Sequence, residues 1–142
     1  MAIEVSVDGF DELVADMKKL VKEFPDEAGD ELRKIGLSIK KDTIIETRRL
    51  CICHPNSKYS LLKNYGVSKV RGVYLNQEVD IFTKSPHFHL VEDGHRMVTP
   101  GGRHVGQVEG RHMLGNVIEK YEPEMPQRFR QMIDKIFERH NF

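Results

Sequence analysis

The chain has 142 residues, with 22 Lys and Arg balanced by 22 Asp and Glu, so its formal net charge is zero. This length predicts one domain over residues 1–142, and the zero balance argues against a protein that grips phosphate backbones through a general excess of cations. Residues 1–8 lack the basic and apolar segments of a signal peptide, and no run of about 18 apolar residues predicts a membrane-spanning helix.

Two amphipathic helices are predicted in the N-terminal third of the chain. Apolar residues recur at helical spacing over residues 10–24, and Pro25 is expected to end this first helix because proline interrupts the backbone hydrogen bonds. A second helix is expected from about Asp26 to about Leu50. Three of its apolar residues lie off its main apolar line: Leu37, Ile44 and Ile45. Their position predicts contact on two sides of this helix, with a partner subunit supplying the second contact.

The middle of the chain predicts a long connection followed by strands. Residues 51–69 form a long link for a compact domain, which predicts a mobile or functional loop. The apolar period then changes to two, and residues 69–83 predict a hairpin that turns at Asn76-Gln77. Ser85-Pro86 predicts the start of a short helix that ends at Gly94.

A second hairpin and an interrupted helix are predicted for the C-terminal part. Residues 95–109 contain the turn signal Pro100-Gly101-Gly102-Arg103 between two alternating segments. From Met113 onward apolar residues recur every three or four positions, which predicts a long helix interrupted near Pro123 and Pro126. The predicted fold class is therefore α+β, with a small antiparallel sheet of hairpins packed against two N-terminal helices and a long, proline-interrupted C-terminal helix.

A histidine-rich segment is one candidate for chemistry. It contains His87, His89, His95, His104 and His112, beside Glu92, Asp93 and Glu109. Imidazole and carboxylate groups bind zinc, so a metal-dependent enzyme or nuclease that uses residues 87–112 is the alternative hypothesis for this chain. The H-E-x-x-H spacing that places two ligands on one helical face is absent. Hydrogen bonds within a polar hairpin or across a subunit contact explain the same histidines, so no metal and no other cofactor is predicted.

A local basic excess in the middle third supports a third hypothesis, an RNA-binding module of a regulatory or toxin-like kind. Its cations are interleaved with Tyr59 and Tyr65, and they are Arg48, Arg49, Lys58, Lys63, Lys69 and Arg71. Such a pattern can follow a phosphate backbone. Acidic residues near the N-terminus offset these cations, and no nucleic-acid motif is recognisable. We favour a solvated face or a basic patch that meets an acidic neighbour, and expect no specific nucleic acid as a partner.

One stretch of the chain carries a family resemblance. It reads Phe88-His89-Leu90-Val91-Glu92-Asp93-Gly94-His95-Arg96, then Thr99, Gly101-Gly102-Arg103, Val105-Gly106-Gln107-Val108-Glu109-Gly110 and His112-Met113. This order resembles the tail-completion, or tail-to-head joining, proteins in the necks of tailed phages and prophages. Members carry an H-L-V-E-x-G-H-R-like segment, a glycine-rich hairpin and a long C-terminal helix. The resemblance covers most of the chain and departs at residues 53–62, where the P-x-D-T-G-x-L stretch of many relatives is replaced.

The resemblance implies a structural role in virion assembly and no enzymatic activity. Such proteins form rings, commonly hexameric, that cap the tail and dock it to the filled head. The implied partners are further copies of the chain, tail-tube or terminator proteins and head-connector proteins, with no membrane involved. The implied location is the tail or neck of the virion, after synthesis in the cytoplasm of the bacterial host. The family has no catalytic residues.

Assembly is expected to use the sheet edges, the 51–69 loop and the off-line side of the second helix. The candidate interface residues are Tyr59, Leu61, Leu62, Tyr65, His95, Arg96, Arg103 and His104. Within the family motif, Gly94 is expected to end the short helix with a positive φ. Glu92 is expected to accept a hydrogen bond or to pair with Arg96 across the turn.

Overall fold

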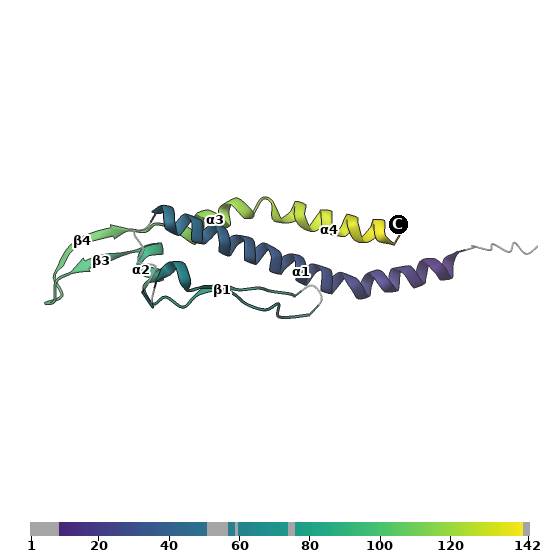
Figure 1. Cartoon of the computed structure of the whole chain (residues 1–142), viewed down its shortest axis with the longest axis horizontal. Helices are drawn as coiled ribbons and strands as arrows, with labels where there is room; N and C mark the ends of the chain where they lie inside the picture. Colours follow the sequence, from purple (N-terminus) through teal and green to yellow (C-terminus); the bar gives the residue numbers. More distant parts are fainter. Residues whose placement is uncertain (1–8, 51–56, 59, 74–75, 141–142) are drawn as a thin grey trace, which may run out of the picture.

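The computed structural model describes residues 9–50, 57–58, 60–73 and 76–140. The fold is α+β, with a long N-terminal helix, two small antiparallel ribbons and C-terminal helices that pack on the first helix. The protomer is elongated, and the first helix runs along most of its length (Figure 1). No helix in this described part of the chain is both long enough and apolar enough to cross a membrane.

The first helix, α1, is continuous from Phe10 to Leu50, so the prediction of two helices separated at Pro25 is wrong. Proline has a φ that fits a helix, but inside one it removes the hydrogen bond to the carbonyl four residues earlier and its ring crowds that carbonyl, so other contacts must offset this cost. Residues of α1 after Pro25 pack against α3 and α4, and the Gln77 side-chain amide donates a hydrogen bond of 2.8 Å to the Pro25 carbonyl. These contacts hold the helix together at Pro25. Acidic residues in the first turn and basic residues in the last turn also favour a single helix dipole.

The predicted single sheet is also wrong, because the strands form two separate ribbons. In the first, β1 (Tyr65–Val67) pairs antiparallel with β2 (Ile81–Thr83), and in the second, β3 (Gly94–Val98) pairs antiparallel with β4 (His104–Glu109). The second hairpin is therefore confirmed. The first hairpin turns earlier than predicted, because Val73 lies in the turn, where its carbonyl accepts a hydrogen bond from the Asn76 amide at 3.1 Å.

The first ribbon lies along α1, whereas the second leads away from the body of the protomer (Figure 1). Close approach of the first ribbon depends on Gly36 in α1, where an added Cβ atom would lie 3.1 Å from Val67 and 3.2 Å from Val79. The neighbour that Gly36 admits is therefore a ribbon. The first ribbon packs on α1, whereas the second contacts α2 at its base. The strands therefore form two ribbons and not one sheet.

The remaining helices are short, and they surround the base of the second ribbon or return along α1. A single 3₁₀ turn, η1 (Leu61–Lys63), precedes β1, and α2 (Phe88–Asp93) precedes β3. The C-terminal helix is divided into α3 (Met113–Tyr121) and α4 (Met125–Arg139). This break confirms the interruption predicted from Pro123 and Pro126, and Pro126 lies in the first turn of α4, where its missing N–H costs nothing.

The loop predicted over residues 51–69 is described at residues 57–58 and in its second half, residues 60–69, since residues 51–56 and 59 lie outside the described part. That second half is structured, because it contains η1 and β1. Leu61 and Tyr65 are buried there, and the Tyr65 hydroxyl lies 2.9 Å from the Thr47 hydroxyl. Leu61 and Tyr65 of this segment therefore belong to the interior of the protomer.

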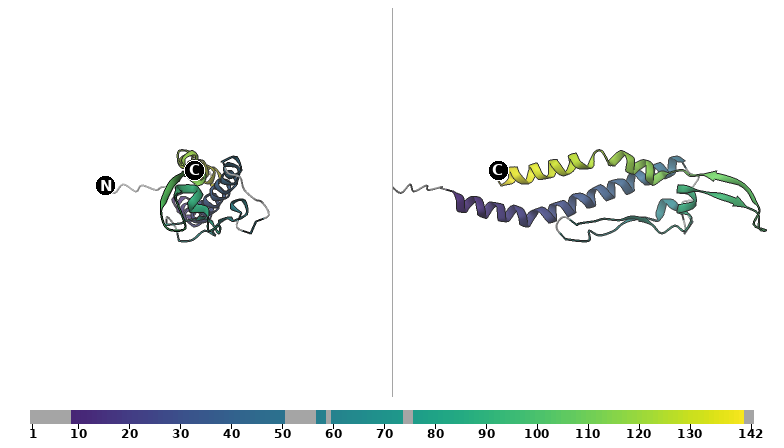
Figure 2. Two further views of the ribbon diagram at one scale, coloured as in Figure 1. Left: turned by 90° about the vertical axis from the view of Figure 1, so that its left-hand side faces the viewer. Right: turned by 180° about the vertical axis from the view of Figure 1, so that it is seen from behind.

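The core lies between α1 and the C-terminal helices. Ile35, Ile39 and Val117 are buried together, and partly buried apolar residues surround them, namely Ile81, Leu114, Ile118, Tyr121, Met125 and Phe129. Polar contacts border this core, because Arg128 of α4 binds Glu31 at 2.9 Å and Tyr121 donates a hydrogen bond of 2.5 Å to Asp42. α3 and α4 are thereby fixed along α1 (Figure 2).

The Tyr121–Asp42 contact makes the free energy of unfolding depend on pH in the alkaline range. Burial, together with the hydrogen bond to Asp42, raises the pKa of Tyr121 to about 12, against about 10 for tyrosine in an unfolded chain. Because the folded protein keeps this proton to higher pH, its free energy of unfolding should fall between pH 10 and 12. The Tyr121→Phe variant should lose this part of the fall in urea titrations, and parallel curves for both proteins would contradict the assignment.

Candidate assembly surfaces

The base of the second ribbon is held by a buried carboxylate. Glu92, at the end of α2, is 9% exposed and accepts hydrogen bonds from the backbone amides of Leu114 at 3.2 Å and Gly115 at 2.9 Å. These amides belong to the first turn of α3, whose own N-cap residue, His112, makes no side-chain capping bond. The carboxylate therefore caps α3 from another element, where its charge also suits the helix dipole.

Glycines allow the chain to pass closely through the same place. Gly94 ends α2 with a φ of 80°, as predicted, and an added Cβ atom would lie 2.3 Å from the Val108 carbonyl. Gly110, opposite it, would place a Cβ atom 2.5 Å from the Glu92 carbonyl. The Arg111 amide also donates to the Val91 carbonyl at 2.8 Å. These contacts fix the direction in which the ribbon leaves the body.

Beyond this base, the second ribbon is exposed on most of its surface. Met97, Val98 and Val105 are 42%, 59% and 58% exposed. A lone two-stranded ribbon is only marginally stable in water, so exposed apolar side chains on it are typical of a contact surface. Figure 1 shows β3 and β4 extending beyond the body at the end opposite to the start of α1.

The predicted interface residues divide into two groups. Arg96, Arg103 and His104 are exposed on the ribbon or at its turn, and His95 is half-buried near its base, with Nδ1 3.4 Å from the Leu90 carbonyl. Leu61 and Tyr65 are buried within the protomer, and Leu62 is half-buried. Tyr59 lies outside the described residues. The structure thus brings together only the residues of the second ribbon as an accessible surface.

The histidine-rich segment is spread over several elements. His87, His89, His104 and His112 are exposed. Within residues 9–50, 57–58, 60–73 and 76–140, no group of three or more His, Cys, Asp or Glu side chains lies close enough together to hold a metal ion.

Part of the basic middle segment is neutralised by neighbouring carboxylates. Arg49 pairs with Glu46 at 2.6 Å, and the hydrogen bond from Arg49 lowers the pKa of Glu46. Arg71 pairs with Glu78 at 3.1 Å and also with Asp80. Cations that are already paired contribute less to binding a phosphate backbone.

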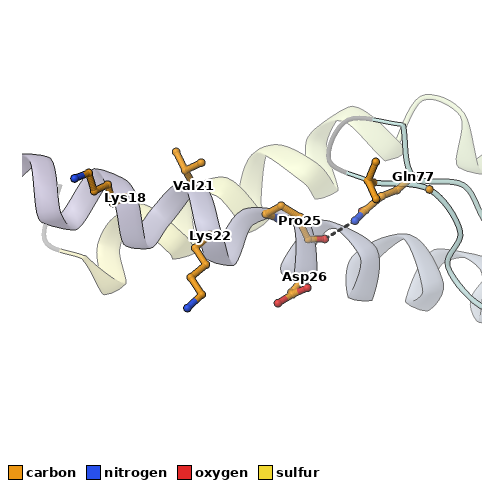
Figure 3. Close-up of a pocket in the computed structure, with 8 residues that line it drawn as sticks. Lys18, Val21, Lys22, Pro25, Asp26 and Gln77 are labelled. Carbon is orange, nitrogen blue, oxygen red and sulfur yellow. Dashed lines mark hydrogen bonds between the residues drawn. The ribbon is translucent and has the colours of Figure 1, made fainter.

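The start of α1 is a second surface that the other described elements leave uncovered, and we call it the tip (residues 10–22). α4 ends near Glu23, whose carboxylate lies 3.0 Å from His140 Nε2, and this contact lowers the pKa of Glu23. The first ribbon reaches α1 at Pro25, through Gln77, where Lys18 and Lys22 line an open groove (Figure 3). The tip extends past both neighbours (Figure 2).

A third uncovered surface lies on α1 near its C-terminal end. It is an open, mostly apolar groove, which we call the basic groove, lined by Leu37, Lys40, Lys41, Ile44, Ile45 and Arg48. Leu37 and Ile45 are 45% and 54% exposed. The sequence placed Leu37, Ile44 and Ile45 off the main apolar line, and no element in the described part of the chain covers this side of α1.

Comparison with known proteins adds no relative to this description. The chain matches no family model, no curated protein and no solved structure. Its function must therefore be inferred from its own geometry and residues.

The Glu92 contacts predict a stability loss that depends on the carboxylate. Glu92→Ala should lower the free energy of unfolding by about 2–3 kcal/mol, because two backbone donors lose a charged acceptor. Amide hydrogens in the first turn of α3 should also exchange faster. The matched control is Asp93→Ala, an exposed neighbour on α2, which should change stability by less than about 0.5 kcal/mol. Equal losses in both variants would contradict the capping role.

Proposed function

We propose that this chain is a structural assembly protein of a phage or prophage neck, which caps the tail or joins it to the head as one subunit of an oligomeric ring. The observation that carries the proposal is the position of the exposed apolar side chains. Six of the eleven exposed large apolar side chains among the described residues lie on the tip or on the second ribbon, namely Leu13, Met17, Val21, Met97, Val98 and Val105. These two elements form the opposite ends of the elongated protomer (Figure 1). A protein built to contact neighbours at both ends needs such surfaces.

The residues that carry the family resemblance support the same role. Glu92, Gly94 and Gly110 use their hydrogen bonds and their small size to build the base of the ribbon. A carboxylate that accepts two backbone hydrogen bonds is engaged in holding the fold. The motif is thus explained by the need to present a ribbon in a fixed direction, which suits an adaptor between larger assemblies.

The proposed partners follow from the two ends. Further copies of the chain would form the ring, and tail-tube or terminator proteins and head-connector proteins would contact its faces. The ribbon carries Arg96, Arg103 and His104 beside its exposed apolar residues, so it suits a partner surface that combines apolar and acidic groups. The proposed location is the tail or neck of the virion.

Deletion of the gene from its phage tests the proposed function. We expect filled heads and complete tails to accumulate separately, because the protein that joins them is missing. Electron microscopy of the lysate measures the fraction of joined particles. Normal joining in the deletion strain would show that the proposed role is wrong.

Complementation of the same strain tests the ribbon. A Val98→Lys, Val105→Lys double variant should fold, by circular dichroism, and restore at least about tenfold fewer infectious particles than the unchanged chain. Val73→Lys is the matched control, because Val73 is 70% exposed in the turn of the other ribbon. If the double variant restored infectious particles fully, the ribbon would not be part of the contact that joins head and tail.

A further inference from the structure

The tip combines an apolar line with charges that are divided along its length, because its acidic residues come first and Lys18, Lys19 and Lys22 follow. Leu13, Met17 and Val21 recur every four residues and are 46%, 53% and 61% exposed. No hydrogen bond or ion pair among the described residues joins the tip to another element. Its outer half, residues 10–17, contains Asp11, Glu12 and Asp16 and no Lys or Arg, and Asp16 also pairs with Lys19 at 3.3 Å. An uncovered amphipathic helix of this kind fits an apolar groove with a basic border.

The basic groove has the opposite charge. Lys40, Lys41 and Arg48 border its apolar residues. The acidic residues nearest in sequence are already engaged within the protomer, because Asp42 accepts the hydrogen bond from Tyr121 and Glu46 pairs with Arg49. The groove therefore offers apolar contact surrounded by positive charge, which is complementary to the outer half of the tip.

The tip and the basic groove lie on opposite sides of α1. The apolar line of the tip continues at helical spacing into Ile35 and Ile39, which are buried against the core. Leu37 and Ile45 of the groove are exposed on the side that faces away from that core. A two-fold pair would need the tip and the groove of each copy to face the same partner. Surfaces on opposite sides instead give each copy two different neighbours.

We propose that the tip of one copy docks on the basic groove of the next copy, so that copies join head to tail through α1. This contact deepens the proposed function, on which its biological role rests, by naming the surfaces that join the subunits. Leu13, Met17 and Val21 lie against Leu37, Ile44 and Ile45, and the acidic residues of the tip lie beside the cations of the groove. Repeated head-to-tail contacts close into a ring or extend as a filament.

The contact is small, which suits assembly on a template. The tip is about three helical turns long, so one docking event buries less surface than a stable, isolated dimer requires. Ring closure, or a tail surface that holds several copies, adds contacts without new chemistry. We therefore expect association of the free protein that depends on concentration and weakens with added salt.

Reversal of charge on each surface tests the contact. The unchanged full-length protein should associate with rising concentration in sedimentation velocity. The tip variant (Asp11→Lys, Asp16→Lys) and the groove variant (Lys41→Glu, Arg48→Glu) should each associate at least about tenfold more weakly. An equimolar mixture of the two variants should recover association, because each tip then meets a groove of opposite charge. A monomer at every concentration, or a mixture that fails to recover, would overturn the proposal.

The matched control reverses charge elsewhere. Glu119 and Glu122 are exposed on α3 and directly after it and belong to neither surface, so Glu119→Lys with Glu122→Lys should leave association unchanged. Circular dichroism confirms that each variant is folded. The contact and the proposed function fail separately. If the deletion strain fails to join heads to tails but the charge variants associate as strongly as the unchanged protein, only the contact is rejected. If the deletion strain joins them normally and the sedimentation results are as predicted, only the neck function is rejected.

Discussion

The length of α1 relative to the elements that cover it determines the arrangement of the whole protomer. A helix of 41 residues is about 60 Å long, whereas residues 113–139 of α3 and α4 can cover only about 40 Å of it. The apolar stripe of α1 continues past the end of α4, so α3 and α4 cannot bury it fully. Its uncovered remainder is the tip, and the protein carries this apolar surface at the cost of solubility unless a partner covers it.

The second constraint is the Glu92 carboxylate. α2, the second ribbon and α3 meet at this side chain, which lies at the opposite end of the protomer from the tip. Gly94 and Gly110 allow the backbones to approach closely there. One end of the molecule is thus the tip, on which no other described element packs, and the other end is the second ribbon, whose base is held by Glu92. The middle holds the core that keeps the two ends apart.

The elements whose signals are local could be predicted from the sequence. Pro100-Gly101-Gly102-Arg103 fixed the second hairpin, Gly94 fixed the end of α2, and Pro126 located the break in the C-terminal helix. Pro25 misled the prediction, because its local preference to end a helix was overcome by packing further along α1. The partner of Glu92 lies 22 residues away and could not be read from spacing. The off-line position of Leu37, Ile44 and Ile45 was a sufficient signal for the groove, whereas the exposure of the tip depends on where α4 ends, which periodicity along α1 does not show.

Disulfide cross-linking tests the head-to-tail arrangement most directly. In a chain whose own Cys51 and Cys53 are replaced by Ser, Met17→Cys and Ile44→Cys place one thiol on the tip and one in the basic groove. Because each copy would bond to two different neighbours, mild oxidation should give a ladder of dimers, trimers and larger species on a non-reducing gel. The variants with only one of these cysteines should give no species larger than a dimer. A double-cysteine protein that stays monomeric, or that stops at the dimer, would contradict the account.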